Sequence, residues 1–146
     1  MIGLLQRVRR AAVEVAGETV GAIGPGLLVL VGVQRGDGEP QGQRLLERLL
    51  GYRVFPDAEG RMNLSLRDTG GGLLLVPQFT LAADTAKGTR ASFTTAAEPA
   101  QARALFEALL AQARREWPGT GSGVFGADMQ VSLVNDGPVT FWLETA

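Results

Sequence analysis

Apolar and polar residues alternate along the first part of the chain with the two-residue period of β-strands. The alternation over residues 2–15 predicts a strand, and Gly17 is placed to turn the chain back into a second strand over 19–23. The apolar run 27–33 has the length of a strand that is covered on both faces. This pattern predicts an antiparallel start followed by a buried strand.

Two later segments repeat apolar residues every three or four positions, which is the period of an amphipathic helix. In the first, Pro40 is suited to the first helical position and Gly51 to the end. The second begins at Pro99, places an apolar stripe on one face and ends before Pro118-Gly119. We therefore expect two helices in the chain.

Strand-like residues return at 52–55, 73–76, 129–134 and 139–144. A chain of 146 residues fits one domain that buries about two thirds of its unfolded surface. No internal repeat or linker divides the chain. The sequence predicts one α+β domain over residues 1–146, with a mostly antiparallel, barrel-like β-sheet and two helices packed outside it.

The composition removes much of the usual catalytic chemistry, because the chain has no His and no Cys. Thiolate catalysis, a disulfide framework and Cys-ligated zinc are excluded, and the commonest general base near neutral pH is missing. The carboxylates show no metal-ligand spacing. We expect no metal and no cofactor, and main-chain groups become candidates for function.

Charge and hydropathy limit the choice of partner and compartment. The net charge is only −1, which disfavours a long electrostatic track along a nucleic-acid duplex but permits a small footprint. Arg7, Arg9 and Arg10 form the densest basic cluster, which suits phosphate but also fits a general preference for arginine. The longest apolar run, residues 26–33, is far shorter than the roughly 20 residues of a membrane span, so we expect a cytoplasmic protein without a membrane partner.

Gly121-Ser122-Gly123-Val124-Phe125-Gly126 matches the dinucleotide-binding fingerprint letter by letter. However, the segment follows a predicted helix and enters a predicted strand, which is the reverse of the strand-to-helix context that phosphate binding needs. We therefore do not expect a nucleotide loop here. Phe125 and the nearby Met129 suit either core packing or the wall of a pocket that stacks on a base or side chain.

Pro77-Gln78-Phe79-Thr80-Leu81 follows a predicted buried strand. Thr80 could be an ordinary strand residue, and it lacks the neighbouring His or Lys that would make its hydroxyl a nucleophile. Because Pro77 ends the strand ladder, the backbone N–H groups that follow are free to bind an oxyanion.

Asn135-Asp136-Gly137-Pro138-Val139-Thr140 interrupts a strand-like pattern with a proline that cannot donate to a ladder. One interpretation is a hairpin turn between two strands. The other is a cis bond before Pro138, which would point consecutive carbonyls the same way and make a rigid main-chain surface.

Taken together, five segments of the chain resemble the D-aminoacyl-tRNA deacylases: Met1-Ile2 through Val8, Met62-Asn63-Leu64, PQFTL at 77–81, Ala127 to Val131, and NDGPVT at 135–140. The family pattern has Ser-Gln-Phe-Thr-Leu in the first long motif, so the chain departs from it at Pro77. That substitution removes a hydroxyl and a backbone donor.

The resemblance implies hydrolysis of the ester of D-aminoacyl-tRNA, and of glycine attached to the wrong tRNA, by a homodimer that binds the aminoacyl-tRNA 3′ end. Gly137-Pro138 of one subunit, with a cis bond, would enter the partner's pocket and exclude L side chains. Gln78, Phe79 and Thr80 would form the catalytic segment, and the substrate's terminal 2′-hydroxyl would assist the reaction. Phe125, Met129 and Arg7 would bind the substrate.

Three other interpretations stay open. A related animal branch removes misattached L-alanine from a threonine tRNA; it has Pro where this chain has Pro77, but Ala where this chain has Phe79. The absence of a self-evident nucleophile also fits a non-catalytic module that holds tRNA 3′ ends, or a purely structural dimer.

Overall fold

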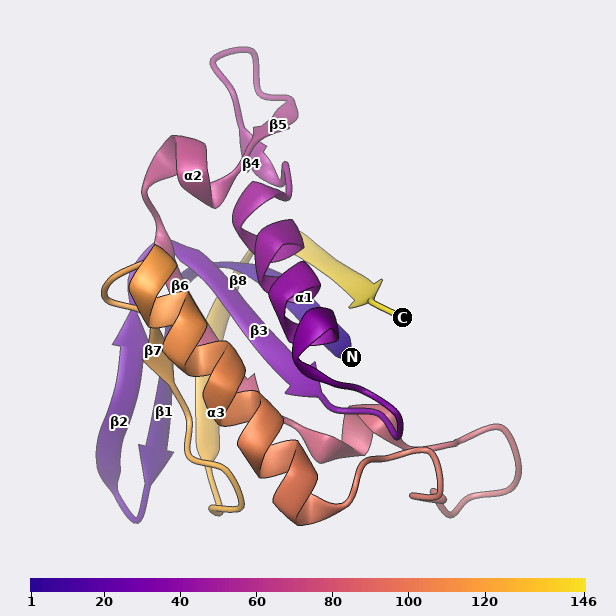
Figure 1. The fold of residues 1–146 in the computed structure, drawn as a ribbon. Helices are drawn as coiled ribbons and strands as arrows, with labels where there is room; N and C mark the ends of the chain where they lie inside the picture. Colours follow the sequence, from indigo (N-terminus) through magenta and orange to yellow (C-terminus); the bar gives the residue numbers. More distant parts are fainter.

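The long strand β1 (Ile2–Val15) organises the sheet, because three other strands pair with it. The computed structural model describes residues 1–146. After β1 come β2 (Glu18–Ile23), β3 (Gly26–Gly32), α1 (Glu39–Gly51), β4 (Phe55–Pro56), β5 (Met62–Leu64), α2 (Leu66–Thr69), β6 (Gly72–Pro77), the single 3₁₀ turn η1 (Phe79–Ala82), α3 (Pro99–Glu116), β7 (Gly121–Ser122) and β8 (Gln130–Glu144). Figure 1 shows α1 and α3 side by side on one face of the sheet, with β8 beyond β1.

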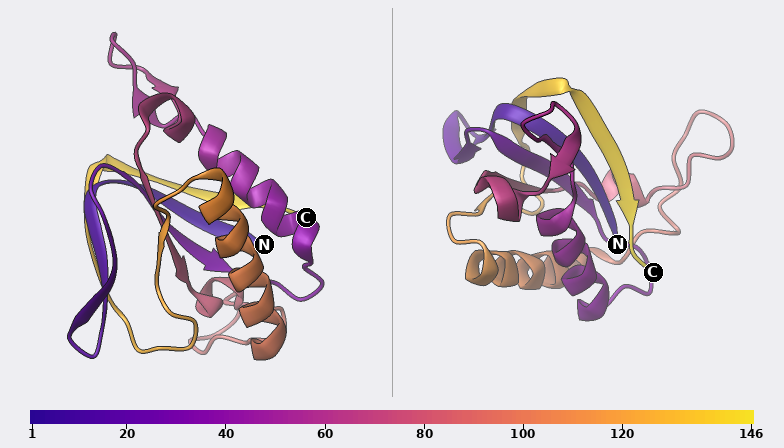
Figure 2. Two further views of the ribbon diagram at one scale, coloured as in Figure 1. Left: turned by 60° about the vertical axis from the view of Figure 1, so that its left-hand side comes forward. Right: turned by 90° about the horizontal axis from the view of Figure 1, so that it is seen from above.

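The sheet is mixed and nearly closed. β1 is antiparallel to β2, β3 and β8, whereas β3–β6 and β6–β7 are parallel pairs. The two ends of the strand order approach each other at Gly21 of β2, where a Cβ atom would lie 2.6 Å from the Ser122 carbonyl oxygen of β7. Only glycine permits this approach of one backbone to another. The expected barrel-like α+β domain is confirmed, with the curvature visible in Figure 2.

Two apolar clusters fill the fold. The larger lies between the helices and the sheet and includes the leucines that α1 repeats on one face, Leu45, Leu46, Leu49 and Leu50. The smaller contains buried side chains of β1, β3 and β6, among them Val8, Leu28 and Leu74. Because β3 and β6 are covered on both faces, they have the continuous apolar sequences that the pattern indicated.

The structure corrects three local expectations. The predicted strand over 52–55 is reduced to Phe55–Pro56, because the chain turns at Val54, whose N–H donates to the Tyr52 carbonyl at 3.1 Å. Pro40 occupies the second position of α1, after Glu39. Helix α2 was not expected.

A capping box accounts for the short helix α2. The Ser65 N–H and hydroxyl both donate to the Asp68 carboxylate, at 2.8 and 3.0 Å, and the Asp68 N–H donates back to the Ser65 hydroxyl oxygen. The bonds from Ser65 hold the pKa of Asp68 below its ordinary value.

The two chain ends meet beside the start of α1 (Figure 1). The Met1 ammonium is fully buried and lies 2.9 Å from Asp37 Oδ1, and it also donates to the Thr145 carbonyl at 2.8 Å. The other carboxylate oxygen of Asp37 accepts the Gln34 N–H at 2.7 Å. The Asp37 carboxylate therefore links the N-terminal residue, Met1, to the loop before α1. The Met1 ammonium in turn links this loop to Thr145 near the C-terminus.

Replacing Asp37 with Asn is expected to lower the free energy of unfolding by about 3–5 kcal/mol, because a buried ammonium is left without its counter-charge. Urea unfolding followed by circular dichroism measures the change. Asp128→Asn is the matched control, since Asp128 is exposed and should shift the midpoint little. Equal midpoints for the two variants would contradict the prediction.

None of the helices is long and apolar enough to span a bilayer.

Candidate functional site

A bulge interrupts β8 where the sequence places Gly137-Pro138, with residues 136–139 opposite the single residue Arg7 of β1. Residues on both sides of it pair antiparallel with β1: Thr140 lies opposite Gln6, and Asn135 lies opposite Val8. The hairpin interpretation is therefore wrong, because the two predicted strands are halves of one strand with the same neighbour. The extra residues of β8 leave the ladder opposite Arg7 as an extruded segment.

Side chains at the base of the bulge hold its shape. Asn135 Oδ1 accepts the Val139 N–H at 2.7 Å, and its amide nitrogen donates to the Thr140 hydroxyl at 2.9 Å. From β1, Arg7 Nε donates to the Asp136 carbonyl at 2.8 Å. Gly137 and Pro138 at the tip are exposed, and the peptide bond between them is cis.

Arg7 links this bulge to the segment that follows α1. Its Nη1 donates to the Val54 carbonyl at 2.6 Å, and its side chain is only 13% exposed. Arg9 is 73% exposed and lies 3.6 Å from the Asp136 carboxylate. Two arginines of the predicted basic cluster therefore surround the bulge, and Arg7 uses two of its nitrogens within its own chain.

Gln78, Phe79 and Thr80 lie where β6 ends and η1 begins. The Gln78 N–H still donates to Val31 of β3 at 2.8 Å, and the first hydrogen bond of the turn runs from the Leu81 N–H to the Gln78 carbonyl. The N–H groups of Phe79 and Thr80 come before that bond and have no partner inside the turn. The Gln78 amide donates to the Thr80 hydroxyl at 2.5 Å, so these two side chains are positioned together.

Phe79 and Phe125 share an apolar pocket of about 240 Å³, which is also lined by Pro77, Pro99, Ala97 and Ala102. Phe79 is 58% exposed, which is unusual for an aromatic side chain in a folded domain. Pro77, the position at which the chain departs from the family motif, lines this pocket. Its apolar ring stands where the family motif has a serine hydroxyl.

Met129 does not line this pocket. It packs against the smaller apolar cluster, and its sulfur lies 3.4 Å from the Val124 backbone nitrogen, beneath the turn that carries Phe125. The structure therefore brings Phe125, but not Met129, to Phe79. Substrate binding by Met129 stays a prediction.

The two motifs lie far apart in one chain. Arg7, beside the bulge, pairs with Leu27 of β3, which pairs with Leu73 of β6, and Phe79 lies six residues beyond Leu73. At about 3.3 Å per residue this separation along the strands is about 20 Å. The Gly137-Pro138 tip therefore does not reach the Phe79 pocket of its own chain.

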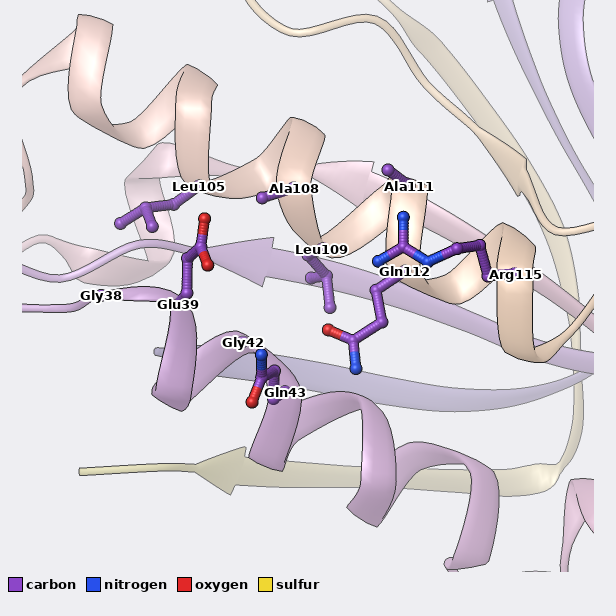
Figure 3. Close-up of a pocket in the computed structure, with 10 residues that line it drawn as sticks. All are labelled: Gly38, Glu39, Gly42, Gln43, Leu105, Ala108, Leu109, Ala111, Gln112 and Arg115. Carbon is purple, nitrogen blue, oxygen red and sulfur yellow. The ribbon is translucent and has the colours of Figure 1, made fainter.

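Another cleft, of about 250 Å³, lies between α1 and α3 (Figure 3). Glu39 of α1 lies beside Leu105 of α3 at one end of it, and Gln112 and Arg115 of α3 lie toward the other end. No residue that the sequence singled out lines this cleft, so the candidate site is the Phe79 pocket together with the bulge.

The structure adds two residues that sequence reasoning did not name, Phe93 and Arg103, and a specific role for Asn135. The Phe93 ring lies 5.3 Å from the Phe79 ring, and the Arg103 guanidinium lies 5.1 Å from the Phe125 ring centroid. Asn135 closes the bulge. Only Asn135 had a signal in the sequence, because an Asn two residues before a Gly is a common turn former.

Comparison with known proteins identifies the family. Residues 4–144 match the model of the family described as D-Tyr-tRNA(Tyr) deacylase. A D-aminoacyl-tRNA deacylase of Thioalkalivibrio sulfidiphilus is 72% identical over 99% of this chain and 97% of its own length. A protein of the same name from Alkalilimnicola ehrlichii is 68% identical over 99% of this chain and 96% of its length.

Solved structures agree with the fold. A structure titled c-Myc DNA Unwinding Element Binding Protein superposes with a TM-score of 0.95 and 38% identity, over 100% of this chain and 99% of that one. A probable eukaryotic D-amino acid tRNA deacylase superposes with a TM-score of 0.82 at 18% identity, over 99% of this chain and 98% of that one, and shares the fold. With a family model that spans nearly the whole chain and relatives of about two-thirds identity, this chain belongs to the D-aminoacyl-tRNA deacylase family of hydrolases.

Proposed function

We propose that this chain hydrolyses the ester of D-aminoacyl-tRNA, and of glycine attached to the wrong tRNA, and that the main chain at Gly137-Pro138 rejects L-aminoacyl esters. The observation that supports the proposed filter is the exposed bulge. This segment lies outside the strand ladder, and hydrogen bonds from Asn135 and Arg7 hold it in place. A rigid backbone obstacle suits stereochemical rejection, because attraction in a pocket gains only about 1–3 kcal/mol per methylene.

The filter would act in the pocket of a second copy of the chain. The separation of about 20 Å along the strands supports this arrangement, since the tip does not reach its own Phe79. In addition, β8 pairs only with β1, so its other edge is open. Three large apolar side chains on this strand are exposed: Val131, Phe141 and Trp142. An open edge with exposed apolar residues favours pairing with another chain.

The chemistry would take place at Gln78, Phe79 and Thr80. Water attacks the ester carbonyl carbon, the carbonyl oxygen becomes an oxyanion, and the bond from carbon to the ribose oxygen then breaks as that oxygen takes a proton. The N–H groups of Phe79 and Thr80 are placed to stabilise the oxyanion, and the Gln78 amide and Thr80 hydroxyl orient the ester. The 2′-hydroxyl of the terminal adenosine assists, because the chain has no His or Cys to act as a base.

Matched D-tyrosyl-tRNA and L-tyrosyl-tRNA test the proposal directly. We expect release of D-tyrosine and no enzyme-dependent release of L-tyrosine, measured by thin-layer chromatography of the labelled amino acid. Equal rates for the two esters would refute the filter. Binding of the D ester without turnover would favour the non-catalytic module instead.

The L-alanine activity of the related branch is a second candidate because Pro77 lines the pocket beside Phe79. L-alanyl-tRNA(Thr) should therefore be assayed in parallel. We expect it to be a poor substrate, since this chain keeps Phe79; faster hydrolysis of L-alanyl-tRNA(Thr) than of D-tyrosyl-tRNA would place the chain with that branch.

Thr80→Val is expected to lower kcat by less than about tenfold, because the hydroxyl orients the substrate and is not the nucleophile. Single-turnover hydrolysis of D-tyrosyl-tRNA measures the change. Mass spectrometry of the quenched reaction provides the decisive check: an acyl group trapped on Thr80 would contradict this assignment.

A further inference from the structure

The loop between η1 and α3 is fastened at its base and free at its tip. Asp84 and Ser92 exchange both backbone hydrogen bonds, at 2.7 and 2.9 Å, and the Thr95 hydroxyl donates to the Ala82 carbonyl at 2.6 Å. All residues from 84 to 95 are exposed. Figures 1 and 2 show the loop projecting away from the body of the domain. Its position is therefore set at the base, while its tip is available to a partner.

This loop carries an aromatic side chain to the edge of the candidate pocket. Phe93 is 45% exposed, and its ring lies 5.3 Å from the ring of Phe79, which is 58% exposed. Two neighbouring aromatic rings that remain accessible form a platform on which nucleic-acid bases stack. The platform adjoins the pocket of about 240 Å³ that Phe79 shares with Phe125.

The tip of the loop is basic. Lys87, the single lysine of the chain, and Arg90 lie in a stretch, residues 85–91, without any acidic residue. Neither cation takes part in an ion pair. Both are fully available to phosphate, in a protein whose net charge is −1.

The acidic groups around the pocket are already engaged. The Asp84 carboxylate accepts the Ala86 N–H at 2.9 Å, Glu98 lies 3.8 Å from Arg35, and Glu107 lies 3.9 Å from Arg103. On the far side of the pocket, Arg103 also lies over the Phe125 ring. The loop over residues 84–95 thus carries two cations against one carboxylate, and both cations lie in its tip.

We propose that the loop over residues 84–95 clamps the single-stranded 3′ end of RNA: Phe93 stacks on a base that precedes the terminal nucleotide, and Lys87 and Arg90 bind the phosphates next to it. This inference rests on the proposed function, because it assumes that the ester enters the Phe79 pocket. The loop lies outside the two motifs. In this proposal it supplies the affinity for the RNA strand, which the main-chain filter does not provide.

The test compares Lys87→Gln/Arg90→Gln with the unaltered protein on two substrates, D-tyrosyl-tRNA and the 3′-D-tyrosyl ester of adenosine, which has no phosphate. With tRNA we expect KM to rise on the order of tenfold, with kcat unchanged. We also expect the slope of log KM against log salt to fall by about 1.4, which is about 0.7 for each phosphate contact. Hydrolysis of the adenosine ester should not change.

Arg61→Gln/Arg67→Gln is the matched control, because it removes the same charge from exposed positions in β4–β5 and α2, away from the pocket (Figure 1). Equal salt slopes for the two double variants would overturn the proposal. If the loop variant changed the sedimentation mass of the protein, the loop would belong to a protein contact and the proposal would also fail.

Phe93 is tested separately. Phe93→Leu should raise KM for tRNA by roughly 5- to 100-fold, and Phe93→Tyr should restore it, because stacking needs an aromatic face. If Phe93→Leu also slowed hydrolysis of the adenosine ester, Phe93 would act only by supporting Phe79. This result would overturn the assignment of Phe93 to base stacking. Failure of the unaltered protein to hydrolyse D-tyrosyl-tRNA would instead refute the proposed function, so the two failures are distinguishable.

Discussion

A D-aminoacyl-tRNA whose terminal ribose lacks the 2′-hydroxyl should be hydrolysed at least about 100-fold more slowly, because a general base contributes about 10²–10⁴ to the rate and this chain offers none at the site. His and Cys are absent from the whole chain. At the candidate site the polar side chains are an amide and a hydroxyl, those of Gln78 and Thr80. The substrate itself therefore has to supply the group that assists water.

The measurement compares the enzymatic rate with the spontaneous rate of the same ester, since removing the hydroxyl also slows spontaneous hydrolysis. A tRNA that lacks the 2′-hydroxyl of the penultimate nucleotide is the control, and it should react at the normal rate. An unchanged acceleration of the terminal deoxy substrate would remove substrate assistance from the mechanism.

Gly137→Ala should lower the ratio of D to L hydrolysis at least tenfold. Gly137 has φ +142, where an L-residue is strained by about 1–3 kcal/mol, and a Cβ there would lie 2.7 Å from Val139 Cγ2. Because Gly137 lies at the exposed tip, the bulge rather than the core has to rearrange. The carbonyls proposed to exclude L side chains would then move, and the free energy of unfolding should fall by no more than this strain of about 1–3 kcal/mol.

Gly60→Ala is the matched control for this substitution. Gly60 also has a positive φ, of 81, but a Cβ there would meet nothing within 4 Å, and the residue lies in the β4–β5 hairpin. It should retain full discrimination in the paired D- and L-tyrosyl-tRNA assay. Undiminished discrimination by Gly137→Ala would show that the tip does not read handedness.

The elements that the sequence predicted well are those that local signals decide. The alternation in β1, the doubly buried runs of β3 and β6, the apolar stripe of α1 and the proline start of α3 need no knowledge of distant residues. The prediction of a strand over 52–55 was wrong because a residue distant in the sequence determines the hydrogen bonding there. The Val54 carbonyl accepts a hydrogen bond from Arg7, far away in the sequence, instead of from a neighbouring strand.

The bulge in β8 could not be distinguished from a hairpin by local pattern. Both interpretations place alternating residues on each side of a Gly-Pro pair, and they differ only in which strand the two halves meet. In a hairpin the two halves would pair with each other, whereas in the structure both halves pair with β1. The sequence located the feature but not its neighbour.

The candidate site was predictable only in part. Gln78, Phe79 and Thr80 lie together because they are consecutive, and Phe125 shares the pocket with Phe79. Phe93 reaches Phe79 only because Asp84 and Ser92 pin the intervening loop, and no periodic pattern encodes such a contact. The Met129 side chain suits both a core and a pocket, and in the structure it packs against the smaller apolar cluster.

In the proposed filter, the residues that set the stereochemical preference lie outside the strand ladder that builds the sheet. The ladder with β1 continues on both sides of the bulge, so residues 136–139 can change without altering any strand pair of the sheet. Polar contacts from Asn135 and Arg7 hold these residues, and only Val139 among them packs against the apolar core. Under the proposed filter, a different stereochemical preference could arise through substitutions in one short segment, without a change in the strand pairing of the sheet.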